Sequence, residues 1–551
     1  MTRPLDLDTV LTCLREALRQ DARHQRRDPQ AADDGARISD QHGMDELGHT
    51  GTARLVAGAV LSWVCGGSPE DLDIATRAAA AIRRLRRPSG RIDLRSCNVD
   101  GDADTAFMLR LLLRCLDLLP SRQDACPALL EDLRTICAEA GRCLLDGGVH
   151  TPNHRWVMAA ALAQTARHFP DLDAASAARR WMAETPDLNA DGLFLERSVG
   201  VYDAVSDSSL LLVDEHLGWP EGRAAALANL RANLMLLNGD GSAETILSTR
   251  QDHGTRTVPS SLIPSYMRAW RLTGDRELGA TAAWLWHQAT DSRLDTLFWI
   301  AAELVLGGPL DLPPADRLAE RRQAWWPTVG LWRLRHGDFA CSVCGQGERL
   351  LTLTWGSNAI AGLGIAHAYF GHGRFVTDSM VPDEQGVCLT SSGHLPPYRL
   401  GYSLALDRPI PPEEWDRTWA ERGLSPRPPC QASLRVDPAP EAETGIDLHL
   451  HSATAPDDVP VQIAFDLPLG GRWQSAGGCM WPREGQVFML QAGSGCYVHD
   501  GYRISIGPGT CGHHYQRMRD TTAPPPACWR LIIPLRTPVD HHLAIRCTIG
   551  P

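Results

Sequence analysis

TPNHRWVMAAALAQTARHFP, residues 151–170, is the kind of stretch that decides the fold of the first half of this chain. Its apolar residues recur at three- and four-residue spacing, which is typical of a helix, and Pro170 ends the run. Similar segments follow one another from about residue 5 to about residue 305, each broken by Gly, Pro or a polar turn. We count roughly ten to twelve of them, so the first half is predicted to be helical.

The arrangement of these helices follows from their similar lengths and short connections. Such helices form either a solenoid or a ring of hairpins, because each hairpin must bury its apolar stripe against neighbours. No fixed sequence period stands out, which disfavours a regular repeat array. We therefore predict an (α/α) toroid, an incomplete helical barrel, over residues 1–320.

The second half has a different residue pattern, which begins after the Pro-, Gly- and charge-rich segment 307–330. Short strand-like stretches then alternate with turn residues, a pattern typical of an antiparallel sandwich. They lie at 349–356, 461–469, 485–493, 502–507, 529–537 and 541–550. We predict an antiparallel β-sandwich over residues 321–551, and hence a multidomain α+β protein. Residues 407–445 are so rich in proline that we expect a long surface loop there.

Composition limits the classes of function. The 551 residues are 43% hydrophobic and 22% charged, as in a globular protein. Net charge is −12 without any block of Lys and Arg, so we expect neither nucleic acid nor a membrane surface as a partner. The N-terminus lacks the apolar core of a signal peptide, and no apolar stretch approaches the ~20 residues that span a bilayer. We expect a cytoplasmic protein.

The 16 cysteines are scattered singly, which favours buried free thiols over a disulfide framework. Cys341 and Cys344 form a Cys-x-x-Cys, but no second pair follows at the spacing of a zinc site.

The start of the helix at 151–170 places two polar side chains where an anion is favoured. Thr151 suits the N-cap and Pro152 the first helical position, so Asn153 and His154 fall in the first turn. Unpaired backbone N–H groups and the positive end of the helix dipole attract negative charge there. The alternative is that Asn153 and His154 only cap the helix and pack.

A resemblance adds to this interpretation. Asn153-His154-Arg155-Trp156 opening a helix, followed by Tyr202 after an Asp191-Gly192 loop, resembles the heparinase II/III-type and alginate-lyase-type polysaccharide lyases. The resemblance implies a helical toroid joined to a β-sandwich and a carbon-oxygen lyase that breaks uronic-acid-containing glycans by β-elimination. One departure is that Asp203 follows Tyr202, where many relatives have a histidine.

The same resemblance implies roles for the catalytic residues. Asn153 would donate to the uronate carboxylate, with His154 beside it as a neutraliser or a base. Tyr202 would protonate the leaving oxygen, and would also take the C5 proton if nearby cations favoured its phenolate. Arg250, in the cluster Ser248–His253, has the planar fork that fits a carboxylate, although a solvated or internally paired arginine is the alternative.

Further substrate contacts are expected from five residues, namely Trp156, Glu196, Gln251, His253 and His367. Relatives often bring a histidine or a metal from the sandwich, but the residues around His367 favour a structural, hydrogen-bonded histidine. We predict no cofactor and no metal, with a divalent metal near His367 left as an alternative.

Two other functions stay open at this point. A glycoside hydrolase on the same toroid would need paired carboxylates, with Asp191, Glu196 and Asp203 as candidates. A non-catalytic carbohydrate-binding protein would not bring Asn153 and Tyr202 to one place. The identity of the uronate-containing oligosaccharide or polysaccharide and the oligomeric state are left open.

Overall fold

The computed structural model describes residues 4–41, 44–95, 97–289, 293–314, 321–369, 372–394, 397–399, 408–421, 423–454, 456–519 and 521–550. The chain divides into two compact units. One comprises Met1–Leu237 with Gly241–Leu318, and the other comprises Asn238–Asp240 with Ala319–Pro551. The predicted boundary at residue 320 falls within 315–320, which lie outside the described residues.

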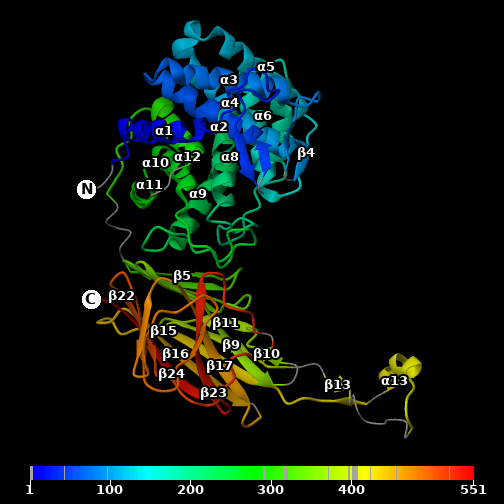
Figure 1. The fold of residues 1–551 in the computed structure, drawn as a ribbon, viewed down its shortest axis with the longest axis vertical. Helices are drawn as coiled ribbons and strands as arrows, with labels where there is room; N and C mark the ends of the chain where they lie inside the picture. The colour runs from blue at the N-terminus through cyan, green and yellow to red at the C-terminus, as the bar shows by residue number, and fades with distance from the viewer. Residues whose placement is uncertain are drawn as a thin grey trace. The chain divides into compact units, whose positions relative to one another are not determined.

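The first unit is built from twelve α-helices in its described part, coloured blue to green in Figure 1. Consecutive helices pack in pairs, α2 with α3, α4 with α5, α6 with α7, α8 with α9 and α10 with α11, while α1 packs on α12. The bounds are α1 Leu7–Ala22, α2 His49–Val64, α3 Pro69–Leu85, α4 Asp102–Leu118, α5 Pro127–Cys143, α6 Pro152–His168, α7 Ala174–Met182, α8 Tyr202–Leu217, α9 Pro220–Leu236, α10 Ile263–Thr273, α11 Arg276–Gln288 and α12 Leu294–Gly307.

The even-numbered helices form an inner ring. Each contacts the next in turn, from α2 to α4 and onward to α12, and α12 contacts α2 again. Helices α2, α4 and α6 are buried along most of their length, as expected of helices that are covered on all sides. The predicted (α/α) toroid is therefore confirmed, with the refinement that its ring of contacts closes.

Short elements complete this unit. They are the hairpins β1 (Ile38–Gln41) with β2 (Met44–Leu47) and β3 (Ile92–Leu94) with β4 (Asn98–Gly101), and the 3₁₀ helices η1 (Leu119–Ala125) and η2 (Ser260–Leu262).

The second unit contains two large sheets. The first has the order β20-β23-β17-β9-β8-β7-β6-β5, with β10 beside β9, and the second has the order β11-β12-β15-β16-β24-β22-β21-β18-β19. The strands are β5 Arg322–Trp326, β6 Leu331–His336, β7 Phe339–Cys344, β8 Leu351–Trp355, β9 Asn358–Tyr369, β10 His372–Arg374, β11 Ser379–Pro382, β12 Val387–Ser391, β15 Gln431–Pro438, β16 Gly445–Thr454, β17 Pro460–Pro468, β18 Arg472–Ser475, β19 Gly478–Met480, β20 Val487–Met489, β21 Gly495–His499, β22 Tyr502–Gly507, β23 Cys528–Arg536 and β24 Asp540–Ile549.

These sheets share one hydrophobic core. Side chains from the first sheet, such as Leu363 and Ile463, belong to the same buried cluster as Leu434 and Ile545 from the second. In the second sheet, strands such as β15 and β24 alternate between buried and less buried positions, whereas β7, β17 and β23 of the first sheet are buried along nearly their whole length. The predicted sandwich is confirmed, and its strand pairs are antiparallel among the described residues except for β20, which runs parallel to β23.

The prediction of a long loop over 407–445 is wrong in part. Strand β15 lies inside that range, between β12 and β16, and buries Ala432, Leu434 and Val436 on alternate positions. Pro428 and Pro429 precede this strand and Pro438 is its last residue, so no proline interrupts the ladder between its ends. The same range holds η4 (Pro412–Glu414), the short helix α13 (Trp415–Glu421) and β14 (Leu424–Ser425), which pairs antiparallel with β13 (Tyr398–Arg399) from just before this range.

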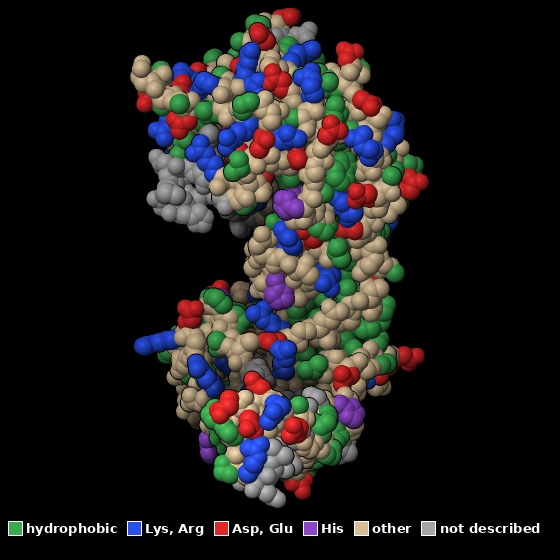
Figure 2. Space-filling model, turned by 90° about the vertical axis from the view of Figure 1, so that its right-hand side faces the viewer, with side chains coloured by type: hydrophobic (Ala, Val, Ile, Leu, Met, Phe, Trp, Pro, Cys, Tyr) green, Lys and Arg blue, Asp and Glu red, His purple; other side chains and the backbone are tan. Residues whose placement is uncertain are grey.

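All sixteen cysteines are free thiols, as expected, and Cys341 and Cys344 are buried within β7. Within the described residues, no helix combines the length and the apolar character that crossing a bilayer requires. On the face of the helical unit seen in the upper part of Figure 2, positive and negative side chains are interspersed rather than separated by sign.

Candidate functional site

The first part of the candidate site is the start of α6. Thr151 occupies the N-cap with an extended backbone and Pro152 follows it, as predicted, although the Thr151 side chain makes no capping bond. Asn153 and His154 therefore lie in the first turn. Asn153 is only 1% exposed, and its Nδ2 donates to Glu196 Oε2 at 2.7 Å.

The second part is the start of α8, which begins at Tyr202. Ser198 Oγ accepts from the backbone N–H of Tyr202 at 3.2 Å and donates to Asp252 Oδ1 at 2.9 Å. Asp252 also accepts from the N–H of Gly200 at 3.1 Å, and a Cβ at Gly200 would lie 2.8 Å from that carboxylate. A buried aspartate thus fixes the backbone that leads into Tyr202, and only glycine leaves room for it at position 200.

Glu196 and Arg250 join these two helix starts. Arg250 Nε lies 3.4 Å from Glu196 Oε1, and the guanidinium carbon lies over the Tyr202 ring, 4.7 Å from its centroid. A hydrogen bond with the Tyr202 side chain, and then the charge of Glu196, raise the pKa of Arg250 above its usual range. Asn153, Glu196, Arg250 and Tyr202 therefore form one continuous line of contacts.

The loop that carries Arg250 is anchored to the backbone of Glu196. Both the N–H and the hydroxyl of Thr249 donate to the Glu196 carbonyl oxygen at 3.1 Å. Thr249 is the neighbour of Arg250, so its bonds to the Glu196 carbonyl hold the backbones of Glu196 and Arg250 close together. The distance between the two charged side chains therefore depends on the backbone as well as on the side chains.

His154 lies beside this line in an aromatic pocket. Phe107 and His150 meet its ring edge-on, with centroids 5.7 and 4.9 Å away. Burial, followed by the nearby His150 and Arg250, lowers the pKa of His154 to about 4. The imidazole is therefore neutral near pH 7 and can accept a proton, but it supplies no positive charge for a carboxylate.

The other predicted residues of this unit lie outside the line of contacts from Asn153 to Tyr202. Gln251 and His253 are exposed, and the Nδ1 atom of His253 lies 3.0 Å from the Ser248 carbonyl oxygen. The expected substrate contact by Trp156 needs correction, because the ring is fully buried in a hydrophobic cluster and its Nε1 donates to Asp187 at 2.8 Å.

The expectation for His367 also needs correction. It lies in β9 of the second unit, is 2% exposed, and its Nδ1 is 3.8 Å from the thiol of Cys430. Burial on a strand at the centre of a sheet is the structural role that the residues themselves favoured, and it is not compatible with direct contact to a glycan.

Sequence reasoning missed Asp252 and Ser198, which position Tyr202. Asp252 lies in the cluster Ser248–His253, but its partners are 52 and 54 residues away in the chain, so its spacing to neighbours does not reveal its role. Only the fold brings these residues together.

Helix α8 also carries two buried carboxyls, Asp203 and Asp207, one turn apart. Asp203 Oδ1 accepts from the N–H of Ser198 at 3.1 Å, and the amide groups of Asn233 and Asn229 on α9 act to lower its pKa. Burial nevertheless raises the pKa of Asp203 to about 7 and that of Asp207 well above its usual range. Asp203 therefore packs against α9, while Glu196 is held in an ion pair with Arg250.

One group among the described residues has the donors for a metal ion, and it lies in the second unit. His449, Asp540 and His542 offer ligand atoms within 4.8 Å of one another on β16 and β24. His449 Nε2 already lies 2.6 Å from Asp540 Oδ1. Asp540 and His542 are exposed and His449 is half-buried, and this group was not anticipated from the sequence.

Comparison with known proteins places the fold. No family model matches the chain, and no curated protein matches it in sequence. Among solved structures, the chondroitin AC lyase of Streptomyces coelicolor A3, in complex with chondroitin sulphate, superposes with a TM-score of 0.51 at 13% identity, covering 98% of this chain and 79% of the other. A Paenibacillus xanthan lyase superposes with a TM-score of 0.57 at 8% identity, covering 99% and 57%.

The chain has the fold of these polysaccharide lyases. Heparinase III is also similar, with a TM-score of 0.47 at 11% identity. The predicted combination of a toroid and a β-sandwich is thereby confirmed, while the chemistry has to be argued from the site.

Proposed function

We propose that this chain is a polysaccharide lyase that cleaves uronic-acid-containing glycans by β-elimination at Tyr202. The observation that carries the proposal is the unbroken line from Asn153 through Glu196 and Arg250 to Tyr202. Two helix starts and a distant loop contribute to it, which is what a site, rather than a set of isolated caps, requires.

The chemistry assigns a task to each group. In the reaction a base removes the proton from C5, the bond from C4 to the bridging oxygen breaks, and a C4–C5 double bond forms. Tyr202 gives its phenolic proton to the leaving oxygen. Arg250, which stays charged beside the phenol, neutralises the substrate carboxylate as negative charge develops on it.

His154 and Asn153 take supporting roles in this proposal. A neutral His154 has a free lone pair for the C5 proton but is a weaker base than an ordinary histidine, and it cannot neutralise charge. Asn153 donates one amide hydrogen to Glu196, and this bond holds Glu196 and thereby Arg250 in place. The second amide hydrogen of Asn153 can still be donated. This replaces the simpler expectation that Asn153 acts on the substrate alone.

The alternatives fit less well. A hydrolase that uses Glu196 and Asp203 would need both carboxyls facing one sugar, yet Glu196 is paired with Arg250, and Asp203 is only 1% exposed and accepts from the N–H of Ser198. A non-catalytic descendant would have no reason to keep Arg250 over Tyr202.

The test is a panel of uronate-containing glycans, beginning with chondroitin sulphate. A lyase product carries a conjugated double bond and absorbs in the ultraviolet, whereas a hydrolase product does not. Tyr202→Phe is expected to keep its circular dichroism spectrum and to lose turnover by at least about 10²-fold, because only the ionisable hydroxyl is removed. Tyr515→Phe, at an exposed site of the second unit, is the matched control. Full activity in Tyr202→Phe, or cleavage without ultraviolet absorbance, would refute the proposal.

A further inference from the structure

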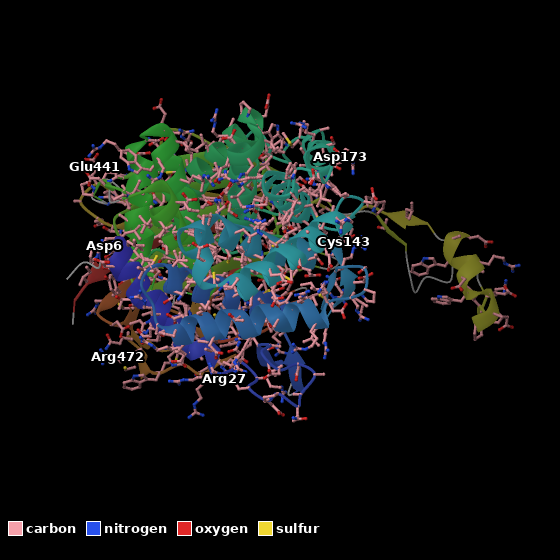
Figure 3. The ribbon with its side chains drawn as sticks, turned by 90° about the horizontal axis from the view of Figure 1, so that it is seen from above. Asp6, Arg27, Cys143, Asp173, Glu441 and Arg472 are labelled. Atoms are coloured by element: carbon pink, nitrogen blue, oxygen red, sulfur yellow. The ribbon has the colours of Figure 1, made fainter. Side chains whose placement is uncertain are left out.

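A cavity of about 200 Å³ lies on the axis of the helical unit. Its lining comes from α2, α4, α8, α10 and α12, which are five of the six inner helices. Figure 3 views this unit from above, with Asp6, Arg27, Cys143 and Asp173 labelled around its edge. The cavity adjoins the candidate site, because Gly200 and Val201, which precede Tyr202, line it together with Phe107, which packs on His154.

Positively charged side chains outnumber negatively charged ones in the lining of this cavity. Four arginines and two carboxylates line it, namely Arg54, Arg110, Arg268, Arg293, Asp295 and Glu303. Asp295 pairs with both Arg54 and Arg293, at 3.5 and 2.6 Å. Arg268 pairs with Glu303 at 3.6 Å and with Glu215. Arg110 is the only one of the four arginines that has no carboxylate partner among the described residues.

The hydrogen-bond partners of the Arg110 side chain are neutral. Arg110 is 5% exposed, and its Nη1 and Nη2 donate to the hydroxyls of Ser209 and Ser208 at 2.9 and 3.0 Å. Its Nε is buried and has no hydrogen-bond partner in the described part of the chain. The ring of Trp299 lies 5.6 Å from the guanidinium carbon. A buried cation with only neutral partners is costly, so such a group points to an anion that binds there.

The charge of Arg110 persists at neutral pH. Burial and the neighbouring Arg114 lower its pKa to about 9, which leaves the guanidinium protonated near pH 7. Arg114 itself pairs with Glu215 at 2.9 Å and with Asp117 at 3.1 Å, so its own charge is already matched.

We propose that the axial cavity binds a sulfate or carboxylate group through Arg110, as a subsite for an acidic substituent of the glycan held at Tyr202. The planar fork of arginine suits the oxygens of such groups, and Trp299 provides an apolar wall for the attached carbon atoms. The part that concerns the glycan rests on the proposed function, whereas the binding of an oxyanion does not.

The experiment titrates the full-length protein with sodium sulfate by isothermal calorimetry, at an ionic strength held constant with sodium chloride. Saturable binding is expected, and Arg110→Gln should weaken it at least tenfold. Arg83→Gln, which removes a partly exposed arginine paired with Asp132, is the matched control and should bind as the wild type does. No saturable binding, or equal binding by Arg110→Gln, would overturn the proposal.

Because Arg110 is buried, Arg110→Gln could fail to fold, and Arg110→Lys keeps the charge while removing the fork. It should fold and bind sulfate more weakly than the wild type. Crystals of the wild type soaked in selenate give a further test, since the anomalous signal of selenium should lie beside Arg110. A selenium peak elsewhere and none in the cavity would overturn the site.

A final comparison distinguishes a free oxyanion from an acidic substituent of the glycan as the ligand of Arg110. Tyr202→Phe should bind a sulfated uronate oligosaccharide more tightly than its desulfated form, and this preference should vanish in the double variant with Arg110→Gln. Equal affinity for both forms would overturn the glycan assignment. Because these measurements need no turnover, they stay informative even if no glycan yields an ultraviolet-absorbing product.

Discussion

Asp203→Asn tests both the electrostatics of α8 and the choice between lyase and hydrolase. In the folded protein, burial raises the pKa of Asp203 to about 7, whereas an unfolded aspartate titrates near 3.8. The folded state therefore holds a proton that the unfolded state releases. Stability from this group is fully present below about pH 4 and is lost as the pH rises towards 7.

The magnitude follows from that difference of about three pKa units. At about 1.4 kcal/mol per unit, an ionised Asp203 costs up to about 4 kcal/mol of unfolding free energy at pH 8. Asparagine keeps an oxygen that can accept from the N–H of Ser198 and carries no charge to bury. Asp203→Asn should therefore be more stable than the wild type at pH 8, by up to about 8 °C in Tm, and the gain should shrink towards zero at pH 4.

The assay is thermal unfolding followed by circular dichroism at pH 4, 6 and 8, with Asp146→Asn, an exposed position, as the control. Turnover is measured on the same samples. A lyase that uses Tyr202 should keep its activity in Asp203→Asn, since the amide preserves the start of α8, whereas a hydrolase that uses this carboxyl should lose activity. A stability difference independent of pH, or a less stable variant at pH 8, would refute the reasoning.

Two further predictions concern His154, beside the line of contacts, and Glu196, within it. His154→Phe should reduce the loss of stability on the acid side of the pH profile. The pKa of His154 is lowered to about 4 in the folded protein, so between pH 6.5 and 4 the unfolded imidazole binds a proton that the folded one does not, and the wild type loses up to about 3 kcal/mol of unfolding free energy. Urea unfolding across this pH range measures the loss, and an equal loss in both proteins would contradict the prediction. Glu196→Ala should destabilise the protein by about 2 to 4 kcal/mol and lower turnover at least tenfold, because Asn153 loses its acceptor and Arg250 its counter-ion. Glu196→Gln, which keeps an acceptor, should cost about 1 kcal/mol, and Glu221→Gln serves as the exposed control; equal losses in both Glu196 variants would contradict the proposed link.

Much of the fold could be predicted because it depends on local periodicity. Helical spacing marked α6 and its start at Thr151 and Pro152, and alternation marked strands such as β17, β23 and β24. Strand β15 was missed because its flanking prolines outweighed the alternation of Ala432, Leu434 and Val436. The candidate site was predicted in part, through Asn153, His154, Tyr202 and Arg250.

By itself, then, the sequence determined the helical first half, the β second half and the polar residues at two helix starts, since capping and periodicity are properties of neighbours in the chain. The tertiary structure alone decided that Glu196 bridges Asn153 and Arg250, that Asp252 holds the turn before Tyr202, and that Trp156 and His367 are buried. It also decided that Arg110 faces an axial cavity without a carboxylate partner among the described residues. These features depend on burial and on contacts between residues 40 to 100 positions apart, which no local pattern encodes.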